Sequence, residues 1–208
     1  MKPSICAIIL AAGTSSRMGK PKQLLPLGEQ SLLERTIHRL VDEDFSEVIA
    51  VIGHEAKAIK EKISIKNERF RWIENEAYLT GQSSSLKTGI VSLKEHHSHA
   101  MVFLGDLPFI SDETIRLIYQ TGVDRLKEYG ESFVIRPTYK EVPGHPVFFG
   151  NINRHHFAQL QGDTGGKSIM KRIPHHILLE VEDEGILMDV DSPEDYVEAK
   201  RRWRGYHE

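Results

Sequence analysis

Short apolar runs alternate with helix-like segments over roughly the first 130 residues of the chain, and this order constrains the fold more than any other feature. The runs have the continuous apolar character of strands buried on both faces. The predicted strands cover residues 4–10, 47–52, 69–73 and 100–104. Ser31 with Glu34, and Ser111, have the pattern of helix N-caps between these runs. The alternation is typical of βαβ units, so an α/β fold with a mostly parallel sheet is expected.

The last 80 or so residues are less regular. Candidate strands cover residues 132–136, 146–149 and 177–181, and a closing helix is expected after the cap residue Ser192, with Pro193 at its first position. The sequence has no internal repeat, low-complexity tract or long linker. We therefore expect a single domain over residues 1–208.

Charge and cysteine content exclude several classes of protein. The 27 basic and 30 acidic side chains leave a formal charge of -3, whereas proteins that grip nucleic acid are usually strongly basic. Cys6 is the single cysteine and lies in an apolar run, which predicts a buried, inert thiol in a reducing compartment. That run is too short for a membrane span. We expect a cytoplasmic protein with neither nucleic acid nor membrane as partner.

The loop after the first strand has the composition of a phosphate site. Small residues at 11–16 would let backbone amides approach a ligand closely, and successive amides form an anion-binding nest. Arg17 offers a planar fork for phosphate oxygens and Lys22 a compact positive charge. Because ligands of open α/β sheets gather at the carboxyl ends of the strands, this loop is a candidate nucleotide triphosphate site. It lacks the G-x-G-x-x-G pattern of Rossmann dinucleotide sites.

Carboxylates near two other segment ends are candidate ligands for Mg²⁺. Asp106 follows the predicted strand at 100–104, with Gly105 before it, so its side chain should point into the same cleft. Asp189 and Asp191 alternate with Val190 and would share one face if this segment were a strand. Either could be the second ligand, and Asp191 could instead cap the closing helix. One or two carboxylates with phosphate oxygens are the usual Mg²⁺ environment.

Several ordered motifs together resemble the MobA-like NTP transferases, the nucleotidyltransferases related to the molybdenum cofactor cytidylyl- and guanylyltransferases. The matching segments, in order, are residues 10–27, 81–86 (GQSSSL), 105–108 (GDLP), 144–146 (GHP), 162–166 (GDTGG) and 188–195 (MDVDSPED). Each motif is weak alone, but the ordered set spans nearly the whole chain. The resemblance implies a single Rossmann-like α/β/α domain with a mostly parallel sheet.

The resemblance also implies a reaction and a set of residues. The phosphate of an acceptor would attack the α-phosphate of a nucleotide and release pyrophosphate, with Mg²⁺ held by Asp106 and Asp191. Arg17, Lys22 and Asp106 would carry the catalytic work. Nucleotide contacts would come from Leu10, Ala11, Ala12, Gly13, Arg17, Lys22, Gly81, Gln82 and Ser84.

The acceptor side is expected in the second half of the chain. His145, fixed between Gly144 and Pro146, matches a family loop that faces the acceptor. Gly162, Asp163 and Lys167 would form a second acceptor loop, with amides and a cation available to anionic groups. The other histidines, including the group at 96–99, are interpreted as solvated, because that group lacks partner carboxylates or cysteines in its neighbourhood in the sequence.

Three functions are compatible with these motifs. The leading hypothesis is a cytidylyltransferase that joins CMP from CTP to a molybdopterin-type cofactor, serving a molybdenum hydroxylase apoenzyme such as xanthine dehydrogenase. The preference for cytidine rests on residues 10–13, which resemble the cytidylyl subgroup. A transferase acting on another small phosphate, such as a sugar or polyol phosphate, is an alternative. A non-catalytic carrier of the mature cofactor is another, and the presence of Lys22, Asp106 and Asp191 together favours catalysis.

Overall fold

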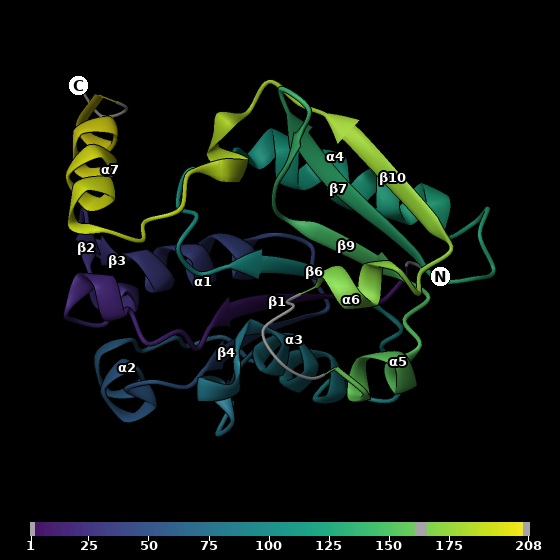
Figure 1. The fold of residues 1–208 in the computed structure, drawn as a ribbon, viewed down its shortest axis with the longest axis horizontal. Coiled ribbons are helices and arrows are strands. Elements are labelled where there is room, and N and C mark those ends of the chain that lie inside the picture. Colours follow the sequence, from purple (N-terminus) through teal and green to yellow (C-terminus); the bar gives the residue numbers. More distant parts are fainter. Residues whose placement is uncertain (1–2, 161–165, 206–208) are drawn as a thin grey trace.

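One eight-stranded sheet runs through the protein in a computed structural model that describes residues 3–160 and 166–205, with only the backbone of Lys167 and Ser168 (Figure 1). The strand order is β10-β7-β9-β6-β1-β4-β5, with β8 paired to β7. The strands are β1 (Ile5–Ala11), β4 (Glu47–Ile52), β5 (Phe70–Glu74), β6 (His99–Leu104), β7 (Phe133–Tyr139), β8 (Val142–Pro143), β9 (Val147–Gly150) and β10 (His175–Glu180).

The expectation of a mostly parallel α/β sheet is confirmed. β1 pairs in parallel with both β4 and β6, β4 with β5, and β7 with β10. Among the described residues of this sheet, only the pairs formed by β8 and β9 are antiparallel. β4 is buried along its whole length, and β1 is buried at every position but Leu10, as their continuous apolar sequences predict.

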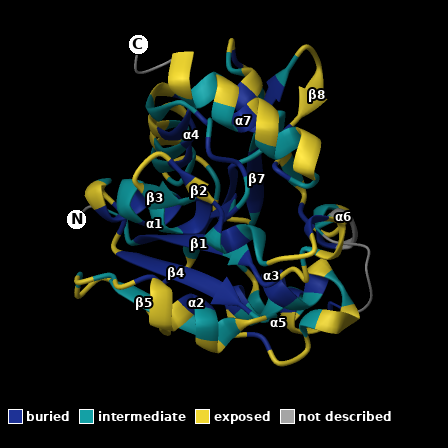
Figure 2. Cartoon of the chain, turned by 90° about the vertical axis from the view of Figure 1, so that its left-hand side faces the viewer, coloured by how far each residue is buried: buried dark blue, intermediate teal, exposed yellow. Residues whose placement is uncertain are grey.

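Helices cover both faces of this sheet and produce three layers. The helices are α1 (Leu32–Asp42), α2 (Ala56–Lys62), α3 (Gln82–Val91), α4 (Asp112–Arg125), α5 (Arg154–Ala158), α6 (Lys167–Met170) and α7 (Pro193–Gly205). Buried side chains of α1, α2 and α4 form one core cluster with the sheet, and those of α3, α5 and α6 form another. Figure 2 shows the buried strands between helices whose outer faces are exposed.

The expected helix caps are also present. Ser31 accepts a hydrogen bond from the Glu34 amide, and the Glu34 carboxylate accepts one from the Ser31 amide, which completes a capping box. Ser111 accepts from the Thr114 amide at 3.1 Å. The Ser192 hydroxyl accepts from the amide of Asp195 at 3.2 Å, so Ser192 caps the closing helix. These local interactions fix where the helices begin.

A third core cluster lies beside the end of the sheet and was not predicted. The long loop after β1 contains a small hairpin of β2 (Pro26–Leu27) and β3 (Gln30–Ser31), and α7 packs against it. The buried members of this cluster are Met18, Leu25, Leu27, Leu32, Val190 and Ala199. It holds the loop after β1 against the segment that precedes α7. No helix in the described part of the chain has the length and apolarity needed to cross a membrane.

Candidate active site

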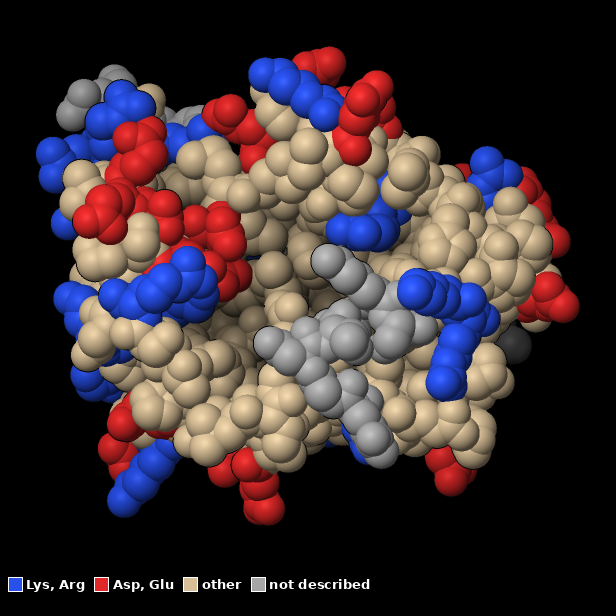
Figure 3. Space-filling model, in the orientation of Figure 1, with Lys and Arg blue, Asp and Glu red and all other residues tan. Residues whose placement is uncertain are grey.

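A cleft with a volume of about 690 Å³ lies at the carboxyl ends of β1 and β6. These strands are parallel, and their arrowheads in Figure 1 point toward the same side of the molecule. Figure 3 shows the face as hollowed near its centre, with acidic and basic side chains along the left margin of the hollow. The cleft is lined by Leu10, Ala11, Ala12, Gly13, Thr14, Lys22, Gln23, Tyr78, Leu79, Gly81, Gln82, Ser85, Leu104, Gly105, Asp106, His145, Asp189 and Asp191.

The loop after β1 is held in shape by its own side chains. Gln23 is 3% exposed, and its amide nitrogen donates to the carbonyl oxygens of Ala11 (2.7 Å) and Gly13 (3.1 Å). The Ser15 hydroxyl accepts from the Lys22 amide at 3.0 Å. Two carbonyl groups that would repel a phosphate are therefore engaged by Gln23, which favours an anion next to this loop.

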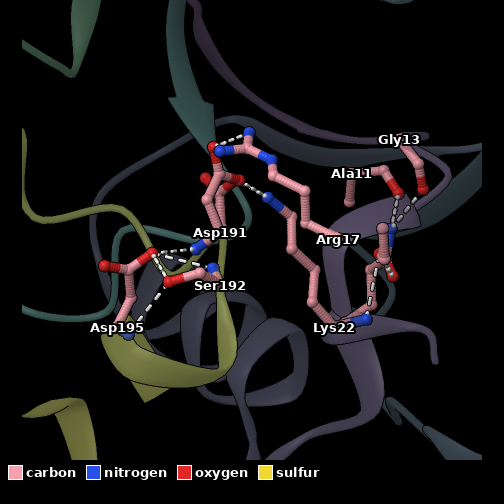
Figure 4. A network of polar contacts seen from close by, with 10 residues as sticks. Ala11, Gly13, Arg17, Lys22, Asp191, Ser192 and Asp195 are labelled. Carbon is pink, nitrogen blue, oxygen red and sulfur yellow. Dashed lines mark hydrogen bonds and ion pairs between the residues drawn. The ribbon is translucent and has the colours of Figure 1, made fainter. Parts of the chain in front are cut away.

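Lys22 bridges two carboxylates that come from distant parts of the chain. Its ammonium group donates to Asp106 and to Asp191, the latter at 2.5 Å. Arg17 donates to the other oxygen of Asp191 at 2.6 Å, and its side chain is 70% exposed. Figure 4 shows Arg17 and Lys22 extending from the loop toward Asp191. The structure brings Arg17, Lys22, Asp106 and Asp191 together at the carboxyl ends of the strands.

The bridge also sets the charge of its members. Burial alone would lower the pKa of Lys22, but the adjacent carboxylates of Asp106 and Asp191 outweigh it and raise that pKa. Burial would raise the pKa of Asp191, yet its bonds to Lys22 and Arg17 lower it. Lys22 is thus an ammonium and Asp191 a carboxylate at neutral pH. By contrast, burial and repulsion by Asp191 and Asp106 raise the pKa of Asp189.

Asp106 fits a divalent cation because half of its carboxylate is unused. Oδ2 accepts from Lys22, whereas Oδ1 is buried and has no hydrogen-bond partner among the described residues. An unsatisfied carboxylate oxygen inside a protein is costly and is typical of a place where another group binds. Together with the carboxylates of Asp189 and Asp191, which line the same cleft, this oxygen gives a donor set of hard oxygens, which is the chemistry that Mg²⁺ requires.

The segment that contains Asp189 and Asp191 does not form the strand considered for it. Residues 188–191 are irregular, and the Val190 amide donates to the carbonyl of Asp106 at 3.0 Å. Val190 is buried in the third core cluster while both aspartates line the cleft. The alternation of aspartate and valine at 189–191 therefore points both carboxylates into the cleft, although the segment is not a strand. The alternative role of Asp191 as a helix cap is also wrong, because Ser192 provides that cap.

Most of the predicted nucleotide residues line the cleft, with two exceptions. Ser84 does not line it: its hydroxyl donates to the Gly81 carbonyl at 2.8 Å and accepts from Asn75 at 2.7 Å, so it fixes the turn before α3. Ser85 lines the cleft in its place. Arg17 does not line the cleft either: it lies at the margin of the cleft, where it pairs with the lining residue Asp191.

The expected acceptor loop falls mostly outside the described residues. Gly162 and Asp163 lie in the segment 161–165, of which the structure gives no description, and Lys167 begins α6 with only its backbone described. His145 does line the cleft, and its Nδ1 lies 3.4 Å from the Val102 carbonyl oxygen. Burial lowers the pKa of His145 to about 4, so its ring is neutral at physiological pH.

Sequence patterns missed three kinds of cleft residue. Tyr78 and the 76% exposed Leu79 come from a single 3-10 turn (Tyr78–Thr80) before α3, which is too short for any periodicity to mark them. Gln23 was overlooked because a buried glutamine gives no pattern. Gly53 carries a weak signal: a Cβ there would lie 2.6 Å from Tyr78 and 3.0 Å from the Ala12 methyl, so this position needs a glycine to let Tyr78 approach the loop.

The interpretation of residues 96–99 as solvated is wrong for His97. Its side chain is 4% exposed, and its Nδ1 lies 2.6 Å from the Ser4 hydroxyl. Cys6, Glu47 and His97 bring ligand atoms within 4.8 Å of one another at the amino ends of the strands. Glu47 is already paired with Arg71 (2.9 Å) and Lys94 (3.1 Å), and burial raises the pKa of Cys6 to about 12. This is a buried ion-pair cluster with a protonated thiol, as expected for an inert Cys6.

The chemistry of the cleft defines the class of protein. Transfer of a nucleotidyl group requires groups that neutralise and align phosphates rather than a nucleophile on the protein, and the cleft has cations and carboxylates of that kind. The protein is accordingly an enzyme of the nucleotidyltransferase class, and its sequence gives the family. The chain belongs to the MobA-like NTP transferase domain family, whose model matches residues 7–177.

Individual relatives cover almost the whole chain at modest identity. It is 27% identical to the molybdenum cofactor cytidylyltransferase of Escherichia coli strain K12, over 96% of this chain and 97% of that protein. It is also 28% identical to a nicotine blue oxidoreductase of Paenarthrobacter nicotinovorans, over 92% and 94%. The crystal structure of an Rv0371c homologue from Mycobacterium sp. strain JC1 superposes with a TM-score of 0.80 at 26% identity, over 97% and 98%. The chain is thus similar to full-length proteins.

Proposed function

We propose that this protein is a Mg²⁺-dependent cytidylyltransferase that transfers CMP from CTP to the phosphate of a molybdopterin-type cofactor and releases pyrophosphate. The observation that carries the proposal is the bridge of Lys22 between Asp106 and Asp191, with the unpartnered Asp106 Oδ1 beside it. Cations and a free carboxylate oxygen at one end of a roomy cleft suit a triphosphate and its metal. The similarity to a molybdenum cofactor cytidylyltransferase supports the choice of substrates.

In the proposed reaction an oxygen of the acceptor phosphate forms a bond to the α-phosphorus of CTP. The bond from that phosphorus to the bridging oxygen of the pyrophosphate breaks, and the electron pair leaves with pyrophosphate. Lys22 and Arg17 neutralise the negative charge that gathers on the triphosphate, and the Gln23-held loop positions it. The protein supplies alignment and charge, and both reacting oxygens belong to the substrates.

Asp106 with Asp191, or with Asp189 in its place, would hold the Mg²⁺. When bound, the ion would withdraw charge from the phosphate oxygens and favour departure of pyrophosphate. Lys22, whose ammonium group lies against Asp106 and Asp191, would supply positive charge to the triphosphate beside these carboxylates. Leu10, Ala11, Ala12, Gly13, Gly81 and Gln82 would surround the nucleotide.

The two halves of the chain would divide the substrates between them. Residues before about 106 line the donor side, whereas His145 and the 162–167 segment belong to the acceptor side. We also propose that residues 1–208 work as one domain, because β6 and β9 belong to one sheet. The product would serve a molybdenum hydroxylase, and the buried thiol of Cys6 suits a reducing compartment such as the cytoplasm.

Pyrophosphate release from each of the four nucleoside triphosphates, with and without molybdopterin, tests the proposal. We expect release with CTP, molybdopterin and Mg²⁺ together, and none after chelation of the metal. Preference for GTP would refute the cytidylyl assignment and keep the class. Release with a sugar or polyol phosphate instead of molybdopterin would favour the alternative acceptor. Tight cofactor binding without turnover would indicate a carrier.

A further inference from the structure

A small second cavity opens beside the cleft on the acceptor side. Its volume is about 150 Å³, and it shares Leu10, Gln82 and His145 with the cleft. Its other lining residues are Leu86, Val102, Arg136, Val147, Phe149, Gly166 and Met170. Its walls are thus mostly apolar, from α3, β6, β9 and α6. Arg136 is the one charged side chain among its described lining residues.

Arg136 has unused hydrogen-bonding capacity in this cavity. It projects from β7 on the same side as Val134, whose side chain packs in the core cluster with α3, α5 and α6. One terminal nitrogen donates to the Pro143 carbonyl at 3.2 Å. The Nε atom is buried and has no partner among the described residues, and burial lowers the pKa of this guanidinium. An arginine whose buried donor is left unpaired carries a desolvation cost that a bound anion would recover.

Two other partly buried arginines of this protein, Arg71 and Arg154, make more hydrogen bonds than Arg136 does. Arg71 pairs with Glu47 through two nitrogens and donates to the Ser92 carbonyl. Arg154 donates to three backbone carbonyls, those of Leu93, Lys94 and His97. These side chains anchor loops, whereas Arg136 makes one such contact and no ion pair with a carboxylate of the described residues. Its surroundings therefore differ in kind from those of a structural arginine.

We propose that Arg136 binds an anionic group of the acceptor, while the apolar walls of the cavity receive an uncharged part of the same molecule. This proposal rests on the proposed function and adds the residue that selects an anionic acceptor. A guanidinium fork suits a phosphate or carboxylate, which it can grip through two nitrogens at once. His145 is neutral and shares the cavity, so Arg136 supplies the positive charge there.

Steady-state kinetics of Arg136→Gln test the proposal with the full chain, CTP, Mg²⁺ and molybdopterin. We expect the KM for molybdopterin to rise at least about tenfold, as for loss of a charged hydrogen bond, and the KM for CTP to stay near the wild-type value. Arg136→Lys should recover part of the loss. Arg125→Gln is the matched control, because Arg125 is a half-exposed α4 residue whose ion pair within the described part of the chain is with Glu128. Equal rises in both KM values, or no change in either, would overturn the assignment.

A second measurement is independent of turnover. The Nε–Hε NMR signal of Arg136, assigned by its loss in Arg136→Gln, should shift when phenyl phosphate is added, because this probe combines an anion with an apolar ring. A protein that releases no pyrophosphate but shows this shift would refute the proposed function and leave Arg136 as an anion site. An unmoved signal up to the solubility limit of phenyl phosphate would reject the role of Arg136. If Arg136→Gln does not fold, the signal is assigned by its loss in Arg136→Lys, and its shift in the wild type together with the kinetics of Arg136→Lys decides.

Discussion

The two ends of the central strands carry clusters built from the same kinds of side chain, with opposite outcomes. At the amino ends, Glu47 is 5% exposed and pairs with Arg71 and Lys94. At the carboxyl ends, Asp106 and Asp191 share Lys22, and the Asp106 Oδ1 has no described partner. One carboxylate with two cations is fully compensated. Two carboxylates with one buried cation, and a third carboxylate nearby, leave capacity for another positive charge.

This difference teaches how to distinguish a structural ion pair from a binding site in a single structure. Burial alone does not do so, since the carboxylate of Glu47 is more deeply buried than those of Asp106 and Asp191. The informative property is whether hydrogen bonds and charges are satisfied without a ligand. A satisfied cluster stabilises the fold, whereas an unsatisfied one at strand ends points to chemistry.

The largest expected effect is that of Asp106→Ala. It should reduce pyrophosphate release by about 10³-fold or more, because a metal ligand stabilises charge in the transition state by several kcal/mol. The chain should stay folded by circular dichroism. Asp124→Ala, at an exposed α4 position, is the control and should keep wild-type turnover. Near-normal turnover of folded Asp106→Ala would contradict the assignment of the carboxyl-end cluster as a binding site, in contrast to the structural cluster around Glu47.

Lys22→Ala should come next, with a loss of about 100-fold in kcat/KM for CTP. Lys20→Ala should change little, because Lys20 is exposed and makes no ion pair with the described residues. Each variant removes one positive charge from the same loop, so a difference between them reports where the charge lies and not how much charge the loop carries. Similar losses for both would mean that overall charge, and not the bridge to Asp106 and Asp191, matters.

At the other end, Glu47→Gln should reduce stability and leave catalysis unchanged. We expect a loss of about 2–3 kcal/mol in the free energy of unfolding in urea, somewhat below that for a fully buried pair, because Arg71 and Lys94 keep some water contact. Glu128→Gln, which breaks the exposed pair with Arg125, should cost less than about 1 kcal/mol. Reduced turnover per folded Glu47→Gln molecule would show that the amino-end cluster influences the cleft.

The smallest effect concerns the half-buried His145 at the carboxyl ends of the strands. The folded-state pKa of His145 is about 4 against 6.5 in an unfolded chain, so only the unfolded chain takes up this proton in between. The neutral, partly buried ring of His145 therefore lowers the stability of the folded chain as the pH falls from 6.5 toward 4, and it has no such effect above pH 6.5. His145→Gln should remove about 1–2 kcal/mol of that acid sensitivity, measured as urea unfolding at a series of pH values. Parallel pH profiles for both proteins would contradict the low pKa.

Local patterns in the sequence predicted the sheet and the donor side of the cleft. Continuous apolar runs gave β1, β4 and β6 within about a residue, because parallel strands are buried on both faces. The loop after β1 and Asp106 follow directly from those strand ends. Arg17, Lys22 and Asp191 were placed with them by ordered motifs, and the structure joins them through ion pairs.

What could not be predicted depends on contacts between distant segments. His97 is in a polar stretch of sequence, and its burial follows from the approach of Ser4 and Glu47. Arg136 lies in an ordinary strand, and its unpaired Nε is visible only once its neighbours are known. Ser84 matched a motif, but its hydrogen bond to Gly81 turns it from the cleft. Sequence spacing identifies residue types at strand ends and does not reveal which donors and acceptors are satisfied.

The bridge from Lys22 to Asp191 spans 169 residues of sequence, and this has a consequence for biosynthesis. During translation at roughly 5–20 residues per second, Asp191 appears on the order of 10–30 s after Lys22. Until then the loop after β1 carries two cations without their carboxylate from the far segment, and α7 has not yet packed against the small hairpin. A nascent chain of this protein can therefore form β1 and β4 well before it has a complete catalytic end, so nucleotide binding belongs to the last stage of its folding.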